Sequence, residues 1–105
     1  MTIIQRPDLD ILMAGMTHII ERNGAEAYVY FDPDGTSHMR LDDGERRTGR
    51  WRLNDDGYEA EWNNGSAGDW QIGRGSDGAF YVNREATVKM RFIGVLFGDE
   101  KGITR

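Results

Sequence analysis

Apolar side chains between Asp8 and Gly24 recur at the spacing of one helical face. They are Leu9, Leu12, Met13, Met16, Ile19 and Ile20. Residues three and four positions apart lie on the same side of an α-helix, so this spacing indicates a helix with one buried stripe. Arg22 would give the last turn a basic side chain, and Gly24 would give it a left-handed stop. The pattern predicts one N-terminal α-helix over about residues 8–23.

After the predicted helix, polar and apolar residues alternate in short stretches. Asp-Gly or Asn-Gly pairs separate these stretches at Asp34-Gly35, Asp43-Gly44, Asp56-Gly57, Asn64-Gly65 and Asp77-Gly78. Asp and Asn tolerate a positive φ and Gly adopts one without cost, so such pairs between alternating stretches indicate hairpin turns. The predicted strands lie near residues 25–31, 36–41, 46–53, 58–63, 69–74, 79–85 and 87–97.

Charge supports the register of the central hairpin. A loop over residues 54–57 pairs Arg52 with Glu59 and Arg50 with Glu61, and both pairs lie on the same face. The opposite face is then apolar and rich in aromatic residues. We therefore expect a hairpin with one solvated face and one buried face.

The same alternation, continued through the neighbouring turns, defines an expected inner face. It comprises Tyr28, Tyr30, Met39, Leu41, Trp51, Leu53, Tyr58 and Trp62. Tyr28 belongs to this face if it lies opposite Met39 across the preceding turn. Pairing symmetric about Ser66 adds Trp70, opposite Trp62. At least six sequential antiparallel strands would thus share one aromatic face.

A sheet with such a face must bury it, and closure into a barrel does so while removing the free edges. The predicted fold class is mainly β: an antiparallel up-and-down meander that closes into a small barrel or a strongly curved sheet. The N-terminal helix would either plug one mouth of the barrel or cover an open curved sheet. A chain of 105 residues has room for one hydrophobic core. We expect a single domain over 1–105, with a helix at 8–23, a meander at 25–97 and a flexible tail at 98–105.

Four segments carry a resemblance to known proteins: Tyr30–Thr36, Thr48–Leu53, Tyr58–Trp62 and Trp70–Ile72. They resemble small bacterial proteins of unknown function with lipocalin-like or streptavidin-like, calycin-type β-barrels. In these a Gly-x-Trp strand follows a Tyr-Phe-x-x-Asp-Gly-Thr hairpin. The resemblance covers roughly residues 25–85. It implies a lipocalin-like barrel, and a barrel of about eight strands is either filled by side chains or holds one small ligand.

Composition narrows the possible partners and the compartment. The net charge of −5 provides no basic surface for a phosphate backbone, which argues against nucleic acid. The longest nearly apolar run, residues 92–97, is far below the roughly 20 residues that span a membrane. The chain has no Cys and no recognisable secretory signal at its start. We therefore predict a cytoplasmic protein, either monomer or homodimer, with no membrane or nucleic-acid partner.

No residue pattern indicates a metal, a cofactor or a catalytic centre. Asp32–Thr36 begins like a calcium loop but lacks the further ligands and flanking helices, which favours a turn. Neither His18 nor His38 has other metal ligands at a suitable spacing. Acid and base groups such as Glu61 and Asp69 form no catalytic constellation. These observations argue against an enzyme and predict no cofactor.

The aromatic cluster is the best candidate site. The candidate ligand-binding residues are Trp51, Tyr58, Trp62, Trp70, Tyr28, Tyr30, Met39 and Arg47. Barrel mouths are preferred ligand sites and aromatic side chains dominate their walls, while an inward Arg47 would favour an anionic partner. The leading hypothesis is a non-catalytic protein that binds a small, largely apolar ligand. Two alternatives stay open: an interaction or inhibitor module that uses an exposed sheet face or edge, and a small enzyme of unknown class.

Overall fold

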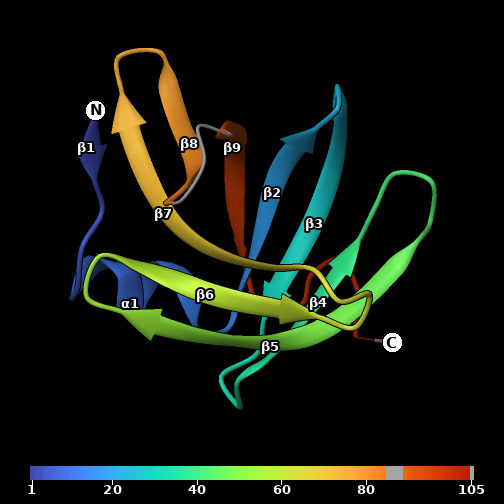
Figure 1. Ribbon diagram of the computed structural model, residues 1–105. Coiled ribbons are helices and arrows are strands. Elements are labelled where there is room, and N and C mark those ends of the chain that lie inside the picture. Colours follow the sequence, from blue (N-terminus) through green and yellow to red (C-terminus); the bar gives the residue numbers. More distant parts are fainter. Residues whose placement is uncertain (85–88, 105) are drawn as a thin grey trace.

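The computed structural model describes residues 1–84 and 89–104 (Figure 1). The chain forms one short helix and nine strands in this part. They are β1 (Thr2–Ile3), α1 (Asp8–Met13), β2 (Met16–Arg22), β3 (Ala25–Phe31), β4 (Thr36–Arg40), β5 (Arg46–Asn54), β6 (Gly57–Trp62), β7 (Ala67–Gly75), β8 (Gly78–Asn83) and β9 (Lys89–Phe97). Among the described residues, no helix is long and apolar enough to cross a membrane.

Strands β2 to β9 form a closed eight-stranded barrel in which every strand is antiparallel to its neighbours (Figure 1). Each strand pairs with the next one along the chain, and β9 closes the barrel by pairing with β2. The short strand β1 is added to the edge of β7, where Thr2 lies opposite Arg74. The predicted fold class, mainly β and up-and-down, is confirmed, and this architecture is consistent with a calycin-like fold.

The N-terminal helix is present but shorter than predicted. It ends at Met13, and Gly15 has a φ of 77° that turns the chain out of the helix. The second half of the predicted 8–23 helix is strand β2, which pairs with β3 on one edge and β9 on the other. These two ladders satisfy backbone groups on both sides of β2, and they outweigh the helical spacing of its side chains.

The registers of two hairpins are confirmed. In β5–β6, Arg52 lies opposite Glu59 and Trp51 lies opposite Ala60, as the charge pattern predicted. In β4–β5, Met39 lies opposite position 47, also as predicted. Short turns between oppositely patterned strands leave little freedom of register, because a slip by one residue would bury the charged face.

The predicted register of β3–β4 is wrong by one residue. Tyr28 lies opposite Arg40 rather than Met39. The backbone N–H of Asp32 donates to the carbonyl of Thr36 at 2.9 Å, so the turn is one residue tighter than the predicted four-residue loop. A shift of one residue reverses the parity of a strand, and β3 therefore buries its alternate residues: Ala27, Val29 and Phe31.

The predicted register of β6–β7 is also wrong, but the parity survives. Trp70 lies opposite Tyr58 rather than Trp62. The backbone N–H of Trp62 donates to the carbonyl of Ser66 at 2.8 Å, so the turn spans only residues 63–65. The resulting slip of an even number of residues leaves Trp70 on the inner face.

The core fills the helix end of the barrel. Leu9 and Met13 of α1 are fully buried there, and the segment before the helix contacts the β5–β6 turn through the Arg6 N–H and the Asp55 carbonyl, 3.0 Å apart. Helix α1 therefore closes one end of the barrel, beside the β5–β6 turn (Figure 1).

The segment after β9 was predicted to be a flexible tail, but residues 98–104 pack against the barrel. Ile103 is 4% exposed, and its carbonyl accepts a hydrogen bond from Arg46 at 3.3 Å. The side chain of Asp99 accepts the backbone N–H groups of Ile103 and Thr104. These contacts hold the segment against β4 and β5. The segment packs there because the barrel buries the apolar side chain of Ile103.

Candidate functional site

The end of the barrel opposite α1 opens into a cavity of about 600 Å³. Its apolar wall is formed by Met39, Trp62, Trp70 and Met90. Its polar rim includes Glu21, Arg22, Asn23, Arg47, Asn64 and Ser66. Ligand cavities in proteins commonly have volumes of about 300–1,000 Å³, with mainly apolar walls and a few polar groups. The cavity therefore has the size and lining of a small-molecule site.

Strand alternation places these side chains together. Met39 and Arg47 are direct partners in the β4–β5 ladder, so both point into the barrel from adjacent strands. The indole of Trp70 lies over the backbone of Gly68, where an added Cβ would overlap the indole nitrogen. The glycine thus makes room for the ring against β7.

Two guanidinium groups carry the charge of the cavity lining. Nε of Arg47 donates to the Glu45 carboxylate at 2.7 Å, and the Arg47 side chain is 18% exposed. Arg22 is half-buried, and no described residue forms an ion pair or hydrogen bond with its side chain. Glu21 is the acidic residue among the described lining. The lining therefore has a net positive charge.

Four of the eight predicted ligand-binding residues line this cavity: Met39, Arg47, Trp62 and Trp70. The other four lie elsewhere. Tyr28 and Tyr30 are half-buried on the outer face of β3, contrary to the predicted inward orientation. Arg40 and Lys101 lie over the Tyr28 ring, 5.4 and 4.9 Å from its centroid, and the Tyr30 ring lies 6.4 Å from that of His38.

Trp51 and Tyr58 belong to the packed core at the helix end. The indole N–H of Trp51 donates to the carbonyl of Asp32 at 2.9 Å. Tyr58 is 4% exposed, and both rings pack edge-on against Phe31, at centroid distances of 5.4 and 5.2 Å. Neither side chain is among those that line the cavity.

A buried hydrogen-bond chain crosses the core beneath the cavity. Nε2 of His18 lies 2.9 Å from the carbonyl oxygen of Leu12, which can only accept, so Nε2 carries the proton. Nδ1 is then the acceptor for the Tyr81 hydroxyl, and Tyr81 also hydrogen-bonds to Tyr58. The chain ties helix α1 to strands β2, β8 and β6.

Burial decides the protonation states in this chain. It lowers the pKa of His18 from 6.5 to about 4, against a smaller opposing effect of the hydrogen bond to Leu12. It raises the pKa values of Tyr58 and Tyr81. The Phe31 and Phe92 rings lie against the imidazole, each at a centroid distance of 4.8 Å. At neutral pH the imidazole and both hydroxyls are therefore neutral, which suits a structural role.

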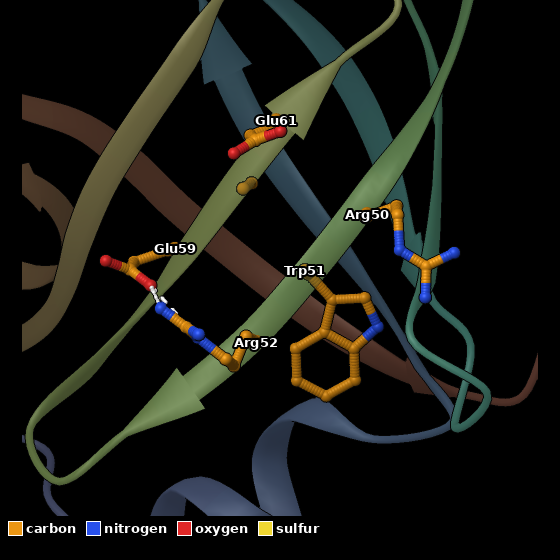
Figure 2. Close-up of a pocket in the computed structure, with 6 residues that line it drawn as sticks. Arg50, Trp51, Arg52, Glu59 and Glu61 are labelled. Carbon is orange, nitrogen blue, oxygen red and sulfur yellow. Dashed lines mark hydrogen bonds and ion pairs between the residues drawn. The ribbon is translucent and has the colours of Figure 1, made fainter.

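A second hollow lies on the outer face of β5 and β6, where Arg52 pairs with Glu59 (Figure 2). The side chain of Arg52 is 78% exposed. Arg50 lies opposite Glu61 in the ladder but extends away from it toward the turn at Gly35, so the second ion pair predicted on this face is not formed (Figure 2). Four of the six residues that line this hollow are charged, and we assign no binding role to it.

The sequence prediction missed Arg22 and Met90 as residues of the site. Arg22 was placed at the end of a helix, whereas it is the last residue of β2 at the rim of the cavity. A signal was present, because Asn23-Gly24 is a turn pair like the others and has φ values of 51° and 80°. Such a pair joins two strands, and it would have placed a strand before it.

Comparison of the chain with protein-family models, with curated proteins and with solved structures found no match. Over residues 1–84 and 89–104, no group of three or more His, Cys, Asp or Glu side chains could hold a metal ion. The class of the protein is therefore defined by its architecture alone: a small closed antiparallel barrel with one end plugged and one end open.

Proposed function

We propose that this chain is a small lipocalin-like binding protein that holds a small, largely apolar ligand at the open end of its barrel. The observation that carries the proposal is the cavity of about 600 Å³ walled by two Trp and two Met side chains. Aromatic and thioether groups provide large apolar contact areas, and a barrel mouth is a common position for a ligand.

The difference between the two barrel ends supports this proposal. Leu9 and Met13 of α1 are fully buried and fill the helix end, whereas the cavity lies at the other end. The buried network of His18, Tyr81 and Tyr58 supports one wall of the cavity, because the Tyr81 ring lies 6.2 Å from that of Trp70.

The indole N–H signals of the three tryptophans provide a direct test. Titration with naphthylmethanol, a neutral bicyclic probe, is expected to shift the indole signals of Trp62 and Trp70 in proton–nitrogen correlation spectra. Trp51 serves as the internal control, since its N–H is donated to Asp32 away from the cavity. Single Trp-to-Phe variants assign the three signals. Unchanged spectra up to the solubility limit, or equal shifts of all three signals, would contradict the proposal.

A second candidate function, association with another copy of the chain, is favoured by strand β9. Ile93, Val95 and Phe97 are 45%, 37% and 81% exposed. Strand β8 pairs with residues 89–92 only, so the same edge of residues 93–97 has no described strand partner. A free apolar edge is a template for another strand. Antiparallel pairing of two copies centred on Val95 would place Ile93 opposite Phe97, with apolar side chains in register.

Light scattering behind gel filtration, over a range of protein concentrations, tests this candidate. We expect a concentration-dependent dimer that Phe97→Lys weakens at least tenfold, because a charge would be placed in an apolar contact. Ile11→Lys is the matched control, since Ile11 is 73% exposed on α1 and lies outside β9. A monomer at every concentration would contradict the candidate.

A further inference from the structure

We propose that the cavity takes a planar aromatic carboxylate, with its carboxylate bound by Arg22 and Arg47 and its ring held among the tryptophans. This inference rests on the proposed function, because it names the chemical class of the ligand of the same cavity. It commits to two properties of the ligand, a negative head group and a flat apolar body, which can be tested separately.

Arg22 provides a positive charge at the rim of the cavity. Its side chain is half-buried at the rim of the cavity and has no ion-pair or hydrogen-bond partner among the described residues. Removing part of the water around an ion is costly unless an opposite charge replaces it. A bound carboxylate would provide that charge at the position where the protein itself provides none.

Arg47 also lines the cavity, and its neighbour Glu45 engages only part of its guanidinium group. Only its Nε is engaged, by Glu45 at 2.7 Å, so its two terminal amino groups have no described partner. A guanidinium can bind a carboxylate through two parallel N–H groups, and such paired hydrogen bonds are stronger than neutral ones. The Glu45 carboxylate is 48% exposed, so water screens its attraction for Arg47 and the guanidinium can still serve a ligand.

The wall of the cavity consists of aromatic and thioether side chains. Trp62 and Trp70 present indole rings, and Met39 and Met90 present thioethers. Indole faces stack on aromatic rings, thioether sulfurs make favourable contacts with ring edges, and guanidinium planes lie over ring faces. An aromatic body uses all three contacts, whereas an aliphatic chain uses only buried area. The indole N–H groups of both tryptophans also have no described acceptor.

The net charge of the described cavity lining is opposite in sign to that of the whole chain. The protein has a net charge of −5, yet the described cavity lining carries two arginines and one acid, Glu21. A positive lining within an acidic protein attracts anions to this one place and leaves other surfaces unattractive to them. The lining therefore selects against cationic ligands and favours an anionic one.

A comparison of three probes tests the proposal: naphthoate, naphthylmethanol and octanoate. The affinities are measured from the shifts of the Trp62 and Trp70 indole signals. We expect naphthoate to bind at least tenfold more tightly than either of the others. Added sodium chloride should weaken the binding of naphthoate and leave that of naphthylmethanol unchanged, because only the charged probe depends on screened attraction.

A pair of arginine variants locates the head group. Arg22→Gln is expected to lower the naphthoate affinity at least fivefold and to leave the naphthylmethanol affinity unchanged. Arg74→Gln is the matched control, since it removes the same charge from β7 outside the cavity and should alter neither affinity. Equal effects of the two variants on naphthoate would show a general charge effect and overturn the assignment of the head group.

The three probes also separate failure of this inference from failure of the proposed function. If naphthylmethanol binds as tightly as naphthoate, the anionic head group is overturned while a ligand cavity is supported. If octanoate binds as tightly as naphthoate, the planar body is overturned. If none of the three binds while the fold is intact, both the inference and the proposed function are overturned.

Discussion

Lowering the pH from 6.5 to 4 is expected to reduce the free energy of unfolding by about 3 kcal/mol through His18 alone. Burial depresses the pKa of this base in the folded state, so the unfolded chain binds a proton that the folded chain does not. Stability therefore falls as the pH falls through this window and is unaffected above it. The groups that face the imidazole are the Tyr81 hydroxyl, the Leu12 carbonyl and the Phe31 and Phe92 rings, none of which can stabilise a cation by opposite charge.

Urea unfolding at a series of pH values checks this expectation. His18→Gln should remove the contribution, so the difference in unfolding free energy between the natural protein and the variant changes by about 3 kcal/mol across the window. Hydrogen bonds from Arg84 lower the pKa of Asp56, so protonation of such carboxylates at low pH also destabilises the folded state. This loss is the same in both proteins and therefore cancels in the difference of their unfolding free energies. His38→Gln is the control, because His38 lies on β4 outside the buried network. A constant difference across the series would contradict the buried neutral imidazole.

Gly49→Ala is expected to destabilise the barrel by about 3 kcal/mol or to prevent folding. An added Cβ would overlap the carbonyl oxygen of Glu61 and lie 3.1 Å from the Cα of Trp62. These are backbone atoms of the paired strand β6, so they cannot move without separating the ladder. Gly49 lies opposite Trp62 in the ladder, and what requires a glycine there is the approach of two backbones rather than the Trp62 indole.

The control for this variant is Gly24→Ala. No atom lies within 4 Å of an added Cβ there, and only the positive φ of 80° opposes it. That strain costs about 1 kcal/mol, so urea unfolding should separate the two variants by about 2 kcal/mol. Losses of equal size would show that the close approach of β5 and β6 is not the cause.

Local chemistry explains the parts of the fold that could be predicted. The hairpin β5–β6 was predicted residue for residue, because Arg52 and Glu59 are close in sequence and their turn contains a strong signal. The same holds for Met39 and Arg47, which are two of the four predicted residues that line the cavity. Where the turn length was misjudged by one residue, before β4, the side chains of the preceding strand β3 changed face, and Tyr28 left the inner surface.

The segment Met16–Arg22 shows why the rest could not be predicted. Its apolar residues, Met16, Ile19 and Ile20, fit a helical spacing better than a strict alternation, so periodicity alone favours the wrong element. The decision comes from β9, which lies at the other end of the chain and pairs with β2 to close the barrel. Arg22 was missed as a site residue for the same reason, since only the strand places it at the rim.

The sequence by itself determined the alternation, the turn positions and the existence of one aromatic inner face, because these depend on neighbouring residues and on the backbone preferences of Gly, Asn and Asp. Only the tertiary structure decided that β2 is a strand, that the barrel closes and that the end away from α1 stays open. These features depend on contacts between distant segments, which a local pattern does not specify.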